Sequence, residues 1–264
     1  MQLFCYAWRR YQIWWRFFLV LFCSAAIALS LHLAPFGEVP PVSSASTALP
    51  TLAPHPLPVT LEQWQPSSKD TRDYFEEIKP SPLGHLIWSE FPVTVFYPER
   101  ETNISPNQTQ QQIKWQTAVE QAIAEWSVYL PVEKTSDQDA ADIVILREAP
   151  PVQITVNPET GEREYSLGRN AETRYRFYLD NQQRVRHQMT IYLSPHQRAI
   201  ATLNTARHEF GHALGIWGHS NNSKDALFVR QTAENRGISD ADINTLKKIY
   251  QQPTKLGWPL PESS

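Results

Sequence analysis

The segment that most constrains this chain of 264 residues covers residues 208–219 and reads His-Glu-Phe-Gly-His-Ala-Leu-Gly-Ile-Trp-Gly-His. Residues four apart lie on the same face of an α-helix, so His208 and His212 can present two imidazole nitrogens to one metal ion. Glu209 then falls beside the metal, where its carboxylate can take a proton from a metal-bound water. The spacing therefore predicts a metal-binding helix with a general base.

The end of this segment offers a turn and a third ligand. Gly215 is suited to end the helix, because glycine adopts the left-handed conformation without steric cost. The reversed chain can then bring His219 back to the metal. The alternative is an amphipathic helix with a purely structural role and no bound metal. Its apolar face would centre on Phe210 and leave His208 and His212 on the opposite side, where packing gives no reason for histidines.

The sequence Ala-Arg-His-Glu-Phe-Gly-His-Ala-Leu-Gly, residues 206–215, resembles the metzincin zinc endopeptidases and looks most like their matrixin branch. The metzincin pattern places its third histidine three residues after the glycine, where this chain has Gly218, and His219 follows one residue later. A turn with one extra residue, absorbed by Gly218, favours His219 as the third ligand. The alternative is a thermolysin-like site that uses Glu234, although the sequence around Glu234 shows little helical periodicity.

A second departure from the family follows the zinc segment. Metzincins run on into a turn that places a methionine beneath the metal, and the matching stretch here, residues 225–229, has Phe228 in that place. The methionine is an apolar floor and not a ligand, and phenylalanine can also provide such a floor. The mechanism that the resemblance implies is therefore retained.

The sequence before the zinc segment predicts a strand, a helix and another strand. Residues 91–97 are β-branched and aromatic, which is typical of a strand. Residues 105–108 offer an N-cap serine, a first-turn proline and a capping-box glutamine, and the helix that they start must stop by Pro131. Residues 140–146 form a largely apolar run that is typical of a buried strand. This order favours parallel pairing, as in the N-terminal half of matrixin domains.

Two further strands are expected between residues 174 and 193, where Val185, His187, Met189, Ile191 and Leu193 alternate on one face. In metzincins an edge strand binds extended peptide by main-chain pairing, so this region is the candidate for substrate docking. An ordinary solvated edge would equally explain the polar residues Arg184, Arg186 and His187.

A closing helix is predicted by the capping box of residues 239–242 and the apolar positions that follow it. The expected fold is therefore α+β, a metzincin-like catalytic domain. It would have a twisted, mostly parallel sheet, long helices and a zinc helix followed by a small C-terminal subdomain. The matrixin-like domain is expected over residues 89–252, with a C-terminal tail over residues 253–264.

The N-terminus predicts export. Three arginines precede an uncharged apolar run that ends near residue 34, so residues 1–34 are expected to be a signal sequence or a transmembrane anchor. Residues 35–88 are expected to be a linker, rich in proline and serine in its first part. The domain would be secreted, or membrane-anchored outside the cytoplasm. Both cysteines, Cys5 and Cys23, lie in the N-terminal segment, so the exported domain has no disulfide.

The resemblance implies a zinc metalloendopeptidase acting on protein or peptide substrates. His208, His212 and His219 would bind zinc, and Glu209 would be the catalytic base. A net charge of −3 gives no sign of the basic surface that nucleic-acid binding requires. No acidic loop has the spacing of calcium ligands, so the sequence does not support calcium. The shifted histidine and Phe228 leave an exported zinc-binding module without proteolytic activity as an alternative.

Overall fold

The structure is a computed structural model that describes residues 48–67, 70–152, 154–165, 168–230 and 237–261. The expected signal sequence or anchor, residues 1–34, lies outside the described residues. Among the residues that are described, no helix has the length and the apolar character needed to cross a bilayer.

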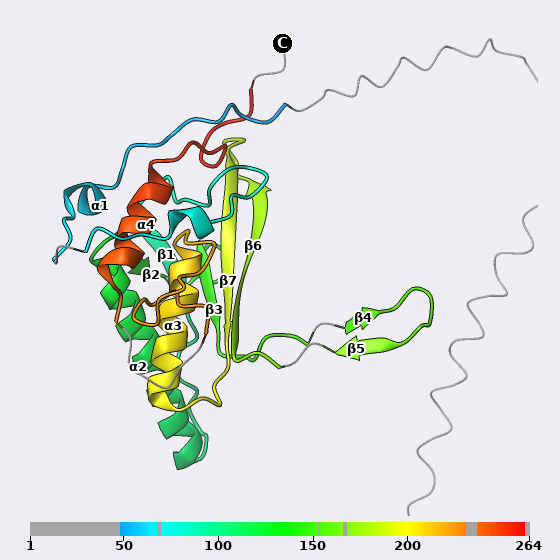
Figure 1. Cartoon of the computed structure of the whole chain (residues 1–264). Helices are drawn as coiled ribbons and strands as arrows, with labels where there is room; N and C mark the ends of the chain where they lie inside the picture. The colour runs from blue at the N-terminus through cyan, green and yellow to red at the C-terminus, as the bar shows by residue number, and fades with distance from the viewer. Residues whose placement is uncertain (1–47, 68–69, 153, 166–167, 231–236, 262–264) are drawn as a thin grey trace, which may run out of the picture. The chain divides into compact units, whose positions relative to one another are not determined.

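A five-stranded sheet is the centre of the fold, with strand order β2-β1-β3-β7-β6 (Figure 1). The strands are β1 (Val93–Phe96), β2 (Val132–Lys134), β3 (Ile143–Leu146), β6 (Ala171–Leu179) and β7 (Val185–Leu193). All neighbours pair in parallel except β6, which runs antiparallel to β7 and forms one edge. The α+β fold with a mostly parallel sheet is therefore confirmed.

Two long helices, α2 (Pro106–Ser127) and α3 (Ala199–Ala213), pack against each other on the same face of this sheet (Figure 1). Helix α2 begins at the expected capping box, with Ser105 as N-cap and Gln108 as its partner. At the contact with α3, Trp126 Nε1 donates to the main-chain oxygen of Arg207 at 3.0 Å, and the Arg207 guanidinium binds both carboxylate oxygens of Glu125. These contacts fix α3, which carries the candidate ligands, on the rest of the core.

Strand β7 lies inside the sheet, between β3 and β6. Its expected apolar alternation is confirmed, because every second residue from Val185 to Leu193 is buried. The idea of a solvated edge is wrong for this strand. His187 is buried and stacks on Trp88 at 3.9 Å between ring centroids, and Arg184 and Arg186 both form ion pairs with Glu90.

Residues 48–67 and 70–88 belong to the folded body, so the structure corrects the expectation of a linker up to residue 88. This stretch contains α1 (Val59–Gln63) and the short 3-10 helix η1 (Phe75–Glu77), and it places Leu61 and Ile87 in the hydrophobic core. Ala53 also pairs with Thr254 through two main-chain hydrogen bonds of 3.1 and 3.0 Å. The first part of the expected linker, residues 35–47, lies outside the described residues.

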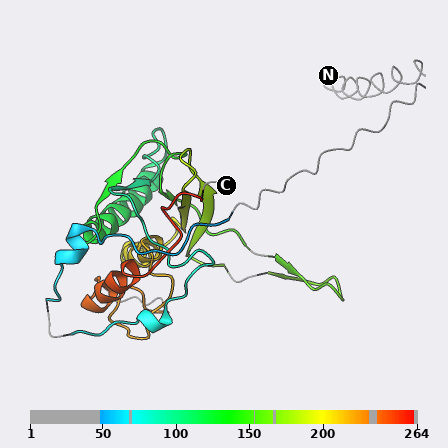
Figure 2. The same cartoon turned by 90° about the horizontal axis from the view of Figure 1, so that it is seen from above.

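The C-terminal region closes the fold with α4 (Asp240–Tyr250), which begins at the predicted capping box of Ser239 and Asp242. The expected tail also packs on the body, since Gly257 N donates to Val185 O at 2.7 Å and Val185 N donates to Trp258 O at 3.1 Å. A hairpin of β4 (Ile154–Val156) and β5 (Arg163–Tyr165), which the sequence did not predict, forms a separate two-stranded sheet (Figure 2).

Candidate metal centre

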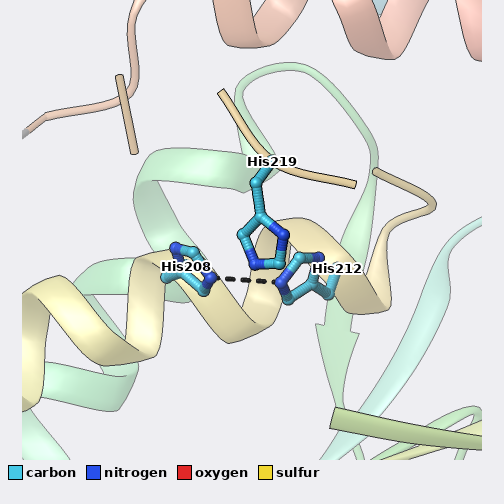
Figure 3. A group of neighbouring side chains, drawn as sticks. All are labelled: His208, His212 and His219. Carbon is cyan, nitrogen blue, oxygen red and sulfur yellow. Dashed lines mark hydrogen bonds between the residues drawn. The ribbon is translucent and has the colours of Figure 1, made fainter. Parts of the chain in front are cut away.

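Helix α3 presents two of the predicted ligands side by side. The Nε2 atoms of His208 and His212 face each other at 3.1 Å (Figure 3). Two nitrogen ligands at the zinc–nitrogen distance of roughly 2.0–2.1 Å in a tetrahedral site lie about 3.3 Å apart. The separation of the two imidazoles therefore suits a single zinc ion.

The third predicted ligand reaches the same place from the turn after α3. One ligand atom each of His208, His212 and His219 can be chosen so that all three lie within 4.8 Å of one another. Figure 3 shows the His219 ring descending from its loop between the other two rings. The structure thus brings the three histidines together, including the one that departs from the family spacing.

Two glycines allow the chain to form this turn without steric clashes. Gly215 has φ +122°, as expected for a residue that ends the helix by left-handed reversal, and a Cβ there would lie 2.3 Å from the main-chain oxygen of Leu86. Gly218 occupies the extra position of the turn, and a Cβ there would lie 2.3 Å from the main-chain oxygen of Glu77. The longer turn is therefore accommodated because residue 218 has no side chain.

Main-chain carbonyls orient both helical imidazoles. His208 Nδ1 lies 3.0 Å from Ala226 O, and His212 Nδ1 lies 2.7 Å from Ile216 O. A carbonyl only accepts hydrogen bonds, so each Nδ1 is the protonated nitrogen and each Nε2 keeps its lone pair for a metal. Such outer contacts fix both the tautomer and the orientation of a ligating histidine.

Burial keeps the imidazoles of His208 and His212 neutral, and His219 is more exposed. Desolvation lowers the pKa of His208 to about 3 and that of His212 to about 4, and it also lowers the pKa of His219. A metal binds the neutral imidazole, and protons compete with it for the same lone pair. The three histidines are therefore in the protonation state that metal binding requires at neutral pH.

Glu209 lies next to His208 on α3 and is only 6% exposed. Its Oε2 accepts a hydrogen bond of 2.7 Å from the hydroxyl of Thr173 on β6. Burial raises the pKa of the Glu209 carboxyl, while neighbouring His208 and the Thr173 hydrogen bond act in the opposite direction. A carboxylate with a raised pKa is better matched to accepting a proton near neutral pH.

A cavity of about 580 Å³ opens over these residues. Its wall includes His208, Glu209, His212 and His219, together with Glu172 and Thr173 of β6 and residues 77 and 79 from the N-terminal part. The candidate ligands and the candidate base therefore face one space that a substrate can enter.

The comparison with protein families agrees with this geometry. The family model described as Matrixin matches residues 100–251, which is more than half of the chain. The chain belongs to the matrixin family. No curated protein matches it.

In this matrixin the turn beneath the histidines is built without methionine. Ala226 provides the carbonyl that orients His208, Leu227 is fully buried, and Phe228 is half-buried. Leu227 Cδ2 lies 2.6 Å from the place where a Cβ on Gly211 would be, so this side chain packs tightly against the zinc helix. The role of Phe228 as the apolar floor stays a prediction.

Two features of the matrixin site were missed by sequence reasoning. Thr173 lies just before the strand region expected from residue 174 and was given no role, and its contact with Glu209 joins residues that are distant in the sequence. Residues 74–79 were assigned to the linker, yet they contact the turn that carries His219. The rival third ligand, Glu234, lies outside the described residues.

Proposed function

We propose that the protein is a zinc-dependent metalloendopeptidase in which His208, His212 and His219 bind zinc and Glu209 is the catalytic base. The observation that carries this proposal is the convergence of the three imidazoles with a buried carboxylate at one cavity. Membership of the matrixin family supports metallopeptidase activity, zinc as the metal, and protein or peptide substrates.

The chemistry follows from the positions of the side chains. Zinc, when bound, would polarise the scissile carbonyl and lower the pKa of a water molecule. Glu209 accepts the proton of that water on its carboxylate and passes it to the leaving amine nitrogen. The Thr173 hydroxyl holds Oε2 of this carboxylate, and the carbonyls of Ala226 and Ile216 hold the two helical imidazoles.

We assign substrate docking to β6. This strand is an edge of the five-stranded sheet, and among the described residues no strand pairs with its outer side, where an extended peptide could bind. Glu172 and Thr173 of the same strand line the cavity, and Thr173 contacts the base. A peptide paired with β6 would therefore run past Glu209 and the three histidines.

We place the catalytic domain outside the cytoplasm, either secreted or held at a membrane by residues 1–34. The support is the sequence of that segment, with arginines before an apolar run. Residues 48–67 and 70–88 pack on the domain, so a linker between segment and domain would be confined to about residues 35–47.

The competing function is a zinc-binding module without proteolytic activity, motivated by the shifted third histidine and by Phe228. Glu209 argues against it, because a structural zinc site is usually closed by four protein ligands and has no use for a base. Among the described residues the cluster consists of three histidines, which leaves a fourth position, as in catalytic zinc sites.

Replacement of the base tests the proposal. We expect the full-length chain with Glu209→Gln to keep one zinc and to cleave a casein substrate at least about a hundredfold more slowly, because only proton transfer is removed. Glu133→Gln is the control, since this exposed carboxylate lies on β2, at the opposite edge of the sheet from β6. Wild-type rates for Glu209→Gln would refute the base. Zinc binding without any cleavage by the wild type would favour the binding module.

A further inference from the structure

We infer that Tyr74 is a positioning residue of the metal centre, acting through Asp242 and Ala226 on His208. The inference rests on the proposed zinc site. Tyr74 lies in the stretch that the sequence assigned to a linker, and it touches neither the histidines nor the base. Its effect on the site would pass through a series of hydrogen bonds.

The first contacts hold Tyr74 on helix α4. Its side chain is 9% exposed, and its hydroxyl donates to Asp242 Oδ1 at 2.6 Å. Its main-chain N–H donates to the hydroxyl of Thr245, one turn further along α4, at 3.0 Å. Residues 70–79 are thereby fastened to the closing helix at two points.

Asp242 connects this contact to the turn beneath the histidines. Its fully buried carboxylate accepts the main-chain N–H of Ala226 on Oδ2 at 2.9 Å. The carbonyl of the same alanine orients His208 through Nδ1 at 3.0 Å. The tyrosine, the aspartate, the alanine and the histidine therefore form one continuous path. A displacement of Asp242 would move the group that aims the first ligand.

The two oxygens of Asp242 are held unequally. Oδ2 accepts from Ala226 N and from both the main-chain N–H and the hydroxyl of Ser239, all at 2.8–2.9 Å. Among the described residues, Oδ1 has Tyr74 at 2.6 Å and otherwise only Leu227 N at 3.4 Å. Without the tyrosine hydroxyl, Oδ1 would keep only this long contact in a buried place, and the carboxylate would be held through Oδ2 alone.

The same N-terminal stretch also contacts the turn that carries the third ligand. Lys79 N donates to Trp217 O at 3.0 Å, and the carbonyl of Glu77 lies against Gly218. Tyr74 thus belongs to a segment that contacts the turn of His219 directly and reaches the turn of Ala226 through Asp242. A substitution that weakens the contacts of this segment should therefore disturb the metal site more than a substitution elsewhere that destabilises the protein equally.

The test compares two substitutions, each of which removes a tyrosine hydroxyl that donates a hydrogen bond to a carboxylate. Tyr97→Phe is the matched control, because Tyr97 is also buried and donates to Glu120 Oε1 at 3.1 Å, between β1 and α2. The full-length proteins are loaded with zinc or cobalt. The zinc dissociation constant is measured by chelator competition, the cobalt absorption spectrum reports ligand geometry, and thermal melting of the metal-free proteins reports stability.

We expect Tyr74→Phe to weaken zinc binding by about tenfold and to alter the cobalt spectrum, as substitutions of outer contacts at metal sites do. Tyr97→Phe should leave both unchanged, even if the two variants melt at similarly lowered temperatures. A Tyr74→Phe protein with the wild-type zinc dissociation constant and cobalt spectrum would overturn the inference.

If Tyr74→Phe does not fold, Thr245→Val takes its place, because it removes the acceptor of Tyr74 N and leaves Asp242 intact. It should shift the zinc dissociation constant in the same direction, and an unchanged constant would overturn the inference. A wild-type chain that binds no zinc at the three histidines would instead refute the proposed function, so the two failures are distinguishable.

Discussion

Thr173 on β6 donates its hydroxyl hydrogen bond to Oε2 of Glu209 on α3 at 2.7 Å, and the same hydroxyl lies 3.1 Å from the main-chain oxygen of Glu209. Both residues are buried. The edge strand proposed to bind peptide is therefore joined directly to the proposed base. This contact can keep the base and a peptide paired with β6 in a fixed relative position.

Thr173→Val should lower kcat/KM by about tenfold without changing zinc content, because general-base catalysis depends on the position of the carboxylate. The matched control is Thr202→Val, which removes a buried hydroxyl that donates to Arg198 O within α3. Peptide cleavage and zinc content of the two variants are compared with the wild type. Equal losses of activity in both would show that the Thr173 contact has no special role.

The two candidate third ligands make opposite predictions. His219→Ala should weaken zinc binding by more than about tenfold, because it removes a direct ligand, whereas Glu234→Ala should leave zinc binding unchanged. His196→Ala is the control for the loss of an exposed histidine. Competition with a zinc chelator measures the affinities. The reverse pattern, with zinc lost only in Glu234→Ala, would support the thermolysin-like site.

Local sequence signals predicted most of the elements that position the site. The capping boxes at Ser105 and Ser239 mark the observed starts of α2 and α4, because a cap is satisfied by residues three positions away. The alternation of β7 was equally readable, since one face of this strand is buried. The apolar residues around Phe210 are buried as expected, but α3 is buried on nearly all sides from Thr205 to Ala213, which its sequence pattern did not show. The convergence of His208, His212 and His219 followed from helix periodicity and one glycine turn.

The rest of the fold depends on contacts between distant residues, which local patterns do not encode. The bridge between Ala53 and Thr254 joins positions on opposite sides of the domain sequence, and Leu61 enters the core from a proline-rich stretch without periodicity. The short strands of the β4–β5 hairpin are likewise defined by their pairing. Prolines in residues 48–66 suggested a tether, yet an extended chain can also pack on a folded surface.

Leu61 tests whether the N-terminal stretch contributes to stability. Its side chain is fully buried, so Leu61→Ala should lower the free energy of unfolding by about 2–5 kcal/mol. Leu52→Ala is the matched control in the same stretch. Leu52 is 49% exposed, so its replacement should lower the free energy of unfolding by under about 1 kcal/mol. Urea unfolding of the metal-free proteins measures both. Equal, small effects would mean that residues 48–66 do not pack stably on the domain.

His187 predicts a pH dependence of stability that is separate from the metal. Burial lowers its pKa from an ordinary 6.5 to about 3, with Arg186 adding to the shift. The unfolded chain therefore takes up a proton as the pH falls below 6.5, while the folded protein does not. The contribution of neutral His187 to the free energy of unfolding is therefore complete above pH 6.5 and is lost progressively as the pH falls towards 3.

Replacing this histidine should flatten that dependence. Between pH 6.5 and 4.5 the metal-free wild type should lose about 2 kcal/mol more unfolding free energy than His187→Phe, whose ring keeps the stack on Trp88. Urea unfolding at both pH values measures the difference. If wild type and variant lose equal stability, His187 does not stay neutral in the folded state.

The central claim is that three histidines and a glutamate form a catalytic zinc site, and the most direct measurement is zinc content together with casein cleavage of the full-length chain before and after chelation. We expect one zinc per chain, loss of cleavage when the zinc is removed, and recovery when zinc is restored. Cleavage that persists in the zinc-free protein would contradict the account.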